Sequence, residues 1–130
     1  MEYILEKLEV YQQAEVFSDV IWNLVDTWNY FQKDTIGKQI AKSADSISVN
    51  IAEGYGRFYF KESKQFYFYS RGSLLETKAW LGKCKRRGII ELTKADDLIV
   101  DAENLLLKLN AFIKFISKSS IHNSPSPKAK

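Results

Sequence analysis

The sequence predicts an all-α protein, an antiparallel up-down-up-down four-helix bundle. The only two prolines, Pro125 and Pro127, lie in the last six residues, so nothing before Ser124 forbids a helix. Apolar residues recur at alternating steps of three and four along four segments, and this spacing places them on one side of a helix. The stretches between the segments are short, and short connections favour antiparallel neighbours.

The apolar stripes set the expected extent of each helix. The four segments are residues 10–31, 36–54, about 61–87 and 95–116. The third is less regular because two stripes run along it: Phe66, Ser70, Ser73, Thr77, Leu81 and Cys84, and beside them Phe68, Gly72, Leu75 and Ala79. A glycine in mid-helix costs up to ~1 kcal/mol in helix propensity. We therefore expect Gly72 and the neighbouring serines to let another helix approach closely.

Capping residues mark the expected helix ends. Ser, Thr, Asp and Asn side chains accept hydrogen bonds from the free N–H groups of a first turn. Glycine tolerates the left-handed conformation that follows many helices. The expected caps are Asp34 or Thr35 before the second helix, Gly54 and Gly56 after it, Gly88 after the third, and Thr93 with Asp96 before the fourth.

Length and composition indicate a single globular domain. The chain has 130 residues, of which 45% are apolar and 27% are charged. We expect the bundle domain over residues 1–118 and a disordered polar tail over residues 119–130. The chain has no run of 18 apolar residues, and its start is acidic where a signal peptide would be basic. The expected location is therefore cytoplasmic.

Two features favour self-association. Ile99, Leu106 and Ile113 form a flank beside the main stripe of the fourth helix, so its apolar face is wider than one seam requires. The run FYFKESKQFYFYS at residues 58–70 is too aromatic to lie wholly inside one domain. The alternative explanation for the wide face is a deeply buried helix.

The positive charge is concentrated in the second and third helices. Residues 35–88 carry a net charge of +7, whereas residues 1–34 carry −5. Such a basic hairpin is typical of a phosphate-binding surface, and Tyr55, Tyr59 and Tyr67 are candidates for stacking on bases. Alternatively, the cations neutralise the acidic first helix or offset a helix dipole. The candidate nucleic-acid-binding residues are Arg57, Lys61, Lys64, Arg71, Lys83, Lys85, Arg86 and Arg87.

The residues needed for catalysis or metal binding are scarce. The single histidine, His122, lies in the tail, and Cys84 is the single cysteine, so a Cys/His zinc site and a histidine triad are excluded within one chain. We expect Glu53 and Glu76 to be buried in a structural polar network between the second and third helices. Its other expected members are Ser43, Ser46, Asn50, Arg71, Ser73 and Thr77. The sequence predicts no enzyme, no metal and no cofactor.

Two motifs carry a family resemblance. SADSISVNIAEGYGR at 43–57 and SRGSLLETKAWL at 70–81 resemble the four-helix bundle family named after proteins encoded in intervening sequences of bacterial 23S rRNA genes. The resemblance covers about residues 8–116. It implies a left-handed antiparallel bundle that assembles as a ring-like homopentamer without enzymatic activity. The family-defining positions are Asn50, Glu53, Gly54, Gly56, Arg57, Arg71, Gly72, Ser73 and Glu76.

The resemblance also bears on partners. The fold is similar to the accessory variability determinant of diversity-generating retroelements, a basic pentamer that binds nucleic acid and a reverse transcriptase. We therefore expect a non-enzymatic oligomer that binds RNA, DNA or a ribonucleoprotein through the surface of the second and third helices. A protein partner such as a reverse transcriptase or a ribosomal component fits the same resemblance, and a membrane does not. The alternative function is a protein-binding adaptor or scaffold with no nucleic-acid contact.

Overall fold

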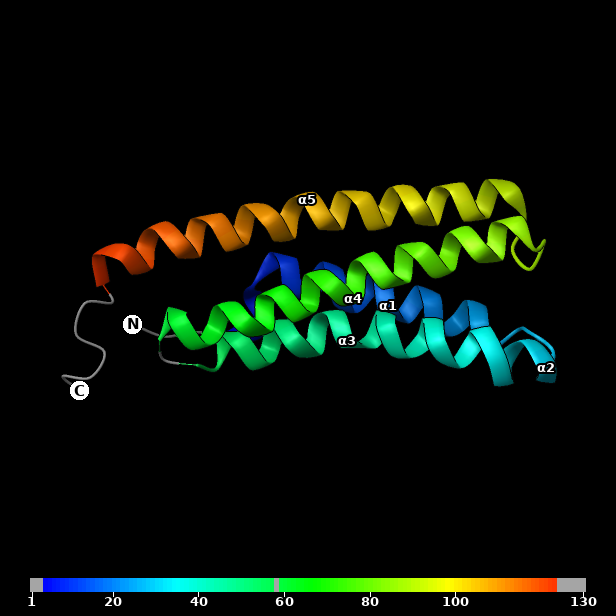
Figure 1. Cartoon of the computed structure of the whole chain (residues 1–130), viewed down its shortest axis with the longest axis horizontal. Coiled ribbons are helices and arrows are strands. Elements are labelled where there is room, and N and C mark those ends of the chain that lie inside the picture. Colours follow the sequence, from blue (N-terminus) through cyan, green and yellow to red (C-terminus); the bar gives the residue numbers. More distant parts are fainter. Residues whose placement is uncertain (1–3, 58, 124–130) are drawn as a thin grey trace.

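The computed structural model describes residues 4–57 and 59–123, with side chains as far as residue 118. Within this range the protein is all-α, as predicted, and contains no strand. Four long helices and three short helical segments make up the fold, which is consistent with a four-helix bundle (Figure 1). The long helices are α1 (Glu9–Val25), α3 (Lys38–Tyr55), α4 (Phe60–Arg86) and α5 (Leu92–Asn123), and the short segments are η1 (Leu5–Lys7), α2 (Tyr30–Gln32) and the π-helical η2 (Lys33–Gly37).

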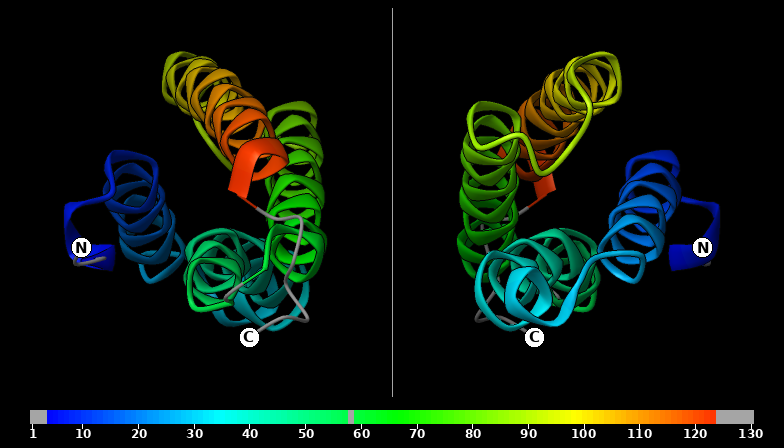
Figure 2. Two further views of the ribbon diagram at one scale, coloured as in Figure 1. Left: turned by 90° about the vertical axis from the view of Figure 1, so that its left-hand side faces the viewer. Right: turned by 90° about the vertical axis from the view of Figure 1, so that its right-hand side faces the viewer.

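The four long helices form an arc that is open on one side. Seen end-on, α3 and α4 lie between α1 and α5 (Figure 2). The α3–α4 pair makes the most extensive contact, and α1 and α5 touch much less. Between α1 and α5 lies a hollow of about 450 Å³, lined by Val16, Phe17 and Leu105 among others. Among the helices that the structure describes, none combines the length and the hydropathy that a membrane span requires.

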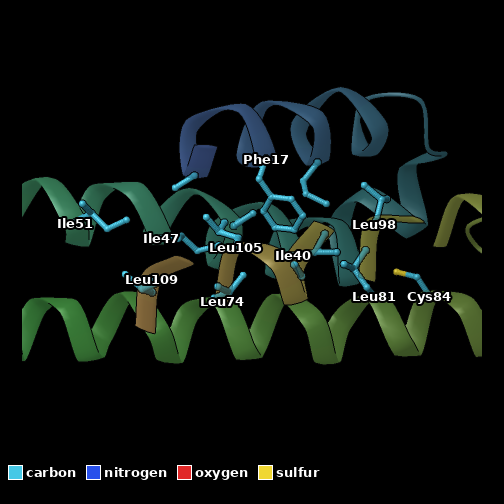
Figure 3. Close-up of a cluster of buried hydrophobic side chains, with 14 of the residues drawn as sticks. Phe17, Ile40, Ile47, Ile51, Leu74, Leu81, Cys84, Leu98, Leu105 and Leu109 are labelled. Carbon is cyan, nitrogen blue, oxygen red and sulfur yellow. The ribbon is translucent and has the colours of Figure 1, made fainter. Parts of the chain in front are cut away.

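The predicted apolar stripes form the core. The stripes of α1, α3 and α5 are buried over most of their length, and their side chains fill the space between the helices (Figure 3). Burial of such stripes is the main source of stability in a bundle. The fully buried large apolar side chains are Ile21, Ile40, Ile47, Ile51, Leu74, Leu81, Leu98 and Leu109.

The end of the first helix and the start of the second differ from the prediction. Helix α1 ends at Val25, and the expected last residue of its stripe, Phe31, is 73% exposed on the next helix. That helix is capped by Asn29, whose Oδ1 accepts a hydrogen bond from the N–H of Gln32 at 2.9 Å. The prediction of Asp34 or Thr35 as the cap is therefore wrong. The chain turns at the buried Trp28, and Asn29 then has the extended backbone of a residue that caps a helix.

The glycines end only one helix in the predicted way. Gly88 follows α4 with a φ of +69°, in the left-handed region, as predicted. Gly56 follows α3 with a φ of −81°, and Gly54 lies inside α3, so neither supplies a left-handed turn. The prediction of a Thr93–Asp96 capping box at the start of α5 is also wrong. Glu91 precedes the helix, and its Oε1 accepts a hydrogen bond from the N–H of Lys94 at 3.3 Å.

The second stripe of the third predicted helix is not a packing surface within this chain. Phe68, Gly72, Leu75 and Ala79 of α4 are exposed, and a Cβ added at Gly72 would have no heavy atom within 4 Å. The expected close approach is therefore absent at Gly72 but present at Ser70, which is buried against α3. On α5, Ile99 and Leu106 are half-buried and Ile113 is buried. Helix α5 continues to Asn123, past the boundary expected at residue 118, and the rest of the predicted tail lies outside the described residues.

Candidate nucleic-acid interface

The candidate basic residues are spread along α4 and the residues that flank its two ends. It has 27 residues and therefore spans roughly 40 Å. Lys64 and Lys83 are consequently about 28 Å apart along its axis. The structure thus places the candidates in an N-terminal basic cluster (Arg57, Lys61 and Lys64) and a C-terminal basic cluster (Lys83, Lys85, Arg86 and Arg87), with Arg71 between them.

The N-terminal basic cluster lies where α3 passes into α4. Arg57 pairs with Glu53 at 2.7 Å, and its guanidinium group lies 4.7 Å from the centre of the Phe66 ring. Lys61 and Lys64 form no salt bridge with any described residue. This cluster therefore holds two uncompensated cations beside one that already has a carboxylate partner.

Arg71 joins α4 to α5. Its Nη1 donates a hydrogen bond to Oδ1 of Asn110 at 3.0 Å, and its guanidinium carbon lies 4.8 Å from the centre of the Phe68 ring. Neither partner carries a charge, so Arg71 keeps its full positive charge while its orientation is held from two sides.

The C-terminal basic cluster follows the same pattern. Lys85 pairs with Asp96 of α5 at 2.6 Å. Lys83, Arg86 and Arg87 have no carboxylate within salt-bridge distance among the described residues. Of the eight candidates, two are therefore neutralised, Arg57 and Lys85.

The acidic first helix does not neutralise the basic clusters within this chain. Among the described residues, Glu9 of α1 pairs with Lys108 of α5 at 3.0 Å, and Glu15 accepts a hydrogen bond from Ser48 at 2.6 Å. The carboxylates that reach α4 come from α5, where Asp96 pairs with Lys85 and Glu103 with Lys78. The alternative of neutralisation by the first helix therefore receives no support inside the protomer.

Tyr67 is not available for stacking on bases. Its ring is buried against Phe112, with the ring centres 5.1 Å apart in an edge-to-face arrangement. Burial also raises the pKa of the Tyr67 phenol to about 12. The expectation that it stacks on bases is therefore wrong, because tertiary packing covers the ring. Tyr55 and Tyr59 are half-buried, and both already interact with other groups.

The polar contacts between α3 and α4 are made by hydroxyls. The Ser43 and Thr77 hydroxyl oxygens are 2.8 Å apart, and the Ser70 hydroxyl donates to the carbonyl of Ile47 at 2.7 Å. Asn50 instead donates to the carbonyl of Ser46 within α3, at 2.8 Å. The Ser46 hydroxyl also stays within α3, and the Ser73 carbonyl accepts from Thr77 within α4.

The two carboxylates expected in this network lie outside it. Glu53 and Glu76 are exposed. Glu53 pairs with Arg57, and Glu76 accepts a hydrogen bond from Nε1 of Trp80 at 3.1 Å. Their expected burial is wrong because both side chains lie on the outer face of their helices. Among the described residues no group of three Asp, Glu, His or Cys side chains is placed to hold a metal ion.

Comparison with known proteins settles the family. The model of the 23S rRNA-intervening sequence protein family matches residues 6–111. The chain belongs to this family. The matched range contains both basic clusters and every position that the resemblance marked as family-defining. No curated protein matches the chain.

A solved structure supports the fold of this family member. A protein of unknown function from the S23 ribosomal protein family of Bacteroides thetaiotaomicron VPI-5482 superimposes with a TM-score of 0.73. The two sequences are 23% identical, and the match covers 81% of this chain and 98% of the other. At this identity the likeness establishes the shared fold.

Two aromatic side chains, Phe31 and Trp80, lie beside the C-terminal basic cluster without having been predicted there. Phe31, assigned above to a buried stripe, lines a surface pocket together with Trp80, Lys83 and Arg87. The sequence does indicate that Phe31 departs from the stripe: five positions separate it from Ile36, and this step breaks the pattern of threes and fours. The π-helical segment η2 occupies this step.

Proposed function

We propose that this family member is a non-enzymatic bundle protein that binds RNA through the basic clusters of the α3–α4 hairpin. The observation that carries the proposal is that most of the candidate cations lack a carboxylate partner in the described chain. A cation without such a partner can release counterions by pairing with a phosphate, which is the main source of nucleic-acid affinity. The candidates without a carboxylate partner among the described residues are Lys61, Lys64, Arg71, Lys83, Arg86 and Arg87.

We also propose that the helices run antiparallel, up-down-up-down, and that the chain assembles as a homopentamer. The connections between successive helices alternate between the two ends of the bundle in Figure 1, which supports the first part. Exposed apolar side chains on the outside of α4 and α5 support the second. They are Phe68, Tyr69, Leu75, Val100, Leu107 and Phe115. Assembly would multiply the basic clusters and raise the avidity for a long RNA.

A protein-binding adaptor is the second candidate function. The same exposed apolar side chains favour it, because they would serve equally well to dock another protein such as a reverse transcriptase or a ribosomal component. Binding of this kind would persist at high salt and after nuclease treatment, whereas binding through phosphates would not. We place either activity in the cytoplasm.

A gel shift with fragments of 23S rRNA tests the RNA proposal. We expect retardation at ~50 mM salt that weakens steeply as salt rises, by about 0.7–0.9 logarithmic units of affinity per logarithmic unit of salt for each phosphate contact. The triple variant Lys83→Ala, Arg86→Ala, Arg87→Ala should bind more weakly and with a smaller salt slope. The matched control removes three exposed lysines of α5, Lys94, Lys114 and Lys118. Absence of retardation at ~50 mM salt, or an equal effect of the control, would contradict the proposal.

A further inference from the structure

A pocket lies at the end of the bundle where α2, η2 and the start of α3 meet the end of α4. Its volume is about 550 Å³. We call it the end pocket and define it by Phe31, Asp34, Gln39, Trp80, Lys83 and Arg87 of its lining. In Figure 1 it belongs to the end that carries α2 and the α4–α5 connection.

Two aromatic rings from different helices line the end pocket. Phe31 comes from α2 and is 73% exposed, and Trp80 comes from α4 and is half-buried. The Trp80 indole is held by its hydrogen bond to Glu76, at 3.1 Å. Aromatic rings that remain open to solvent in a pocket gain free energy when a flat apolar surface covers them.

The two cations of the end pocket lie at the end of α4. Lys83 lies in the last turn of α4 and Arg87 is the residue that follows it. The Arg87 N–H donates to the Lys83 carbonyl at 2.9 Å, so the two cations lie one turn apart. Neither pairs with a carboxylate in the described chain. The carboxylate of the pocket, Asp34, is engaged by Lys38 at 2.9 Å. The pocket therefore presents two uncompensated positive charges beside two aromatic rings.

The wall that carries Phe31 has an uncommon backbone. Residues Lys33–Gly37 form a π-helical turn, a conformation that is rare and frequently found at functional sites. A Cβ at Gly37 would lie 3.0 Å from the carbonyl oxygen of Gln32 and 3.0 Å from Cγ1 of Val25, so the wide turn can pack on α1 at this point because residue 37 has no side chain. The π-helical turn follows α2 directly, and the chain passes here from the exposed Phe31 to the buried Ile36.

We infer that the end pocket binds one nucleotide of single-stranded RNA, with the base against Phe31 and Trp80 and a phosphate against Lys83 and Arg87. A nucleotide joins a flat aromatic group to an anion, which is the combination that this lining complements. Asp34 and the Gln39 amide lie in the same lining and offer hydrogen-bonding groups for a base edge. An acidic peptide would use the cations but not the rings. This inference rests on the proposed RNA binding and specifies one contact within it.

Fluorescence anisotropy with a labelled ten-nucleotide single-stranded RNA of mixed sequence tests this inference at ~50 mM salt. We expect Phe31→Ala to weaken binding roughly tenfold, since stacking on one aromatic side chain contributes about that much to affinity. The matched control is Tyr30→Ala, because Tyr30 is the neighbouring residue, is 79% exposed and lies outside the pocket lining. Both substitutions remove an exposed ring and should leave the melting temperature unchanged.

The outcomes separate this inference from the proposed function. If the wild-type protein binds neither the single strand nor its duplex, both ideas fail. If it binds the single strand but Phe31→Ala matches Tyr30→Ala, the end pocket is not a base-binding site and the general RNA proposal stands. If a ten-residue glutamate peptide binds as tightly and loses as much with Phe31→Ala, the pocket does not distinguish a nucleotide from an acidic chain and the inference is overturned. Weaker binding of Phe31→Ala to the single strand, with duplex binding unchanged, supports it.

Discussion

Gly54 of α3 lies directly against the ring of Tyr67 in α4. A Cβ at residue 54 would come within 2.6 Å of Cε1 of Tyr67 and 3.1 Å of the backbone oxygen of Ser63. The absence of a side chain at this position therefore sets how closely the two helices approach. Gly54 is one of the positions that the family resemblance marks. It lies inside α3 and allows close packing against α4, and it does not form a turn after the helix.

Gly54→Ala should destabilise the protein by about 1–2 kcal/mol. The added methyl group must displace either the Tyr67 ring or the backbone of α4, and overpacking of this kind outweighs the better helix propensity of alanine. The measurement is the free energy of unfolding in denaturant. The matched control is Gly72→Ala, which adds the same methyl group to an exposed helical glycine with nothing within 4 Å.

Gly72→Ala should stabilise an isolated chain by up to about 1 kcal/mol, because it only improves helix propensity. If Gly72 lies in the proposed subunit interface, the same substitution should instead reduce the particle mass in light scattering. Equal destabilisation by the two glycine substitutions, with unchanged particle mass, would contradict the close packing at Gly54.

Thr77→Val should destabilise the protein by about 1 kcal/mol. The substitution keeps the shape of the side chain but removes the hydroxyl that lies 2.8 Å from the hydroxyl of Ser43 in the buried α3–α4 contact. Chemical denaturation measures the effect, and Thr93→Val on the exposed start of α5 is the control. A double-mutant cycle with Ser43→Ala should give a coupling energy clearly different from zero, and additive effects would show that the pair does not interact.

Cys84 should resist thiol reagents while the protein is folded. The side chain is fully buried, and burial raises the pKa of the thiol to about 11 even though Arg87 acts to lower it. At pH 8 the thiolate fraction is then on the order of 0.1%, against about 25% in an unfolded chain with an ordinary thiol pKa near 8.5. Labelling by a chromogenic disulfide should be slow in buffer and rapid in denaturant. Immediate stoichiometric labelling in buffer would count against this packing.

Asp45→Asn should stabilise the protein at pH 7. Partial burial, together with Asp19 and Glu15, raises the pKa of the Asp45 carboxyl, so the native state disfavours the charged form. This penalty is absent below the pKa of the unfolded chain and develops as the pH rises through the folded pKa. The gain in melting temperature should therefore be present at pH 7 and vanish near pH 3, and salt should reduce it. Asp97→Asn, at an exposed position on α5, is the control. An equal gain at both pH values would contradict this assignment.

The helices and their buried faces were predictable because their causes are local. A segment without proline and with apolar residues every three or four positions can bury that stripe only as a helix. Ile40, Ile47 and Ile51, for example, lie in the core as their spacing predicts. Gly88 likewise ends α4 through its own backbone conformation. The family likeness could also be read from two short motifs.

The remaining features depend on residues that are distant in the sequence. The Asn29 cap is an exception, because it joins residues three positions apart, and Phe31 lies exposed on the short helix that this cap begins. Tyr67 is covered by Phe112 of another helix. Among the cations, Lys85 is neutralised by a carboxylate of α5, whereas Lys83 is not. Composition and periodicity specify which face of each helix is apolar, but a side chain's partner depends on how the helices pack. The division of the basic residues into two clusters and the formation of the end pocket therefore emerged only from the folded arrangement.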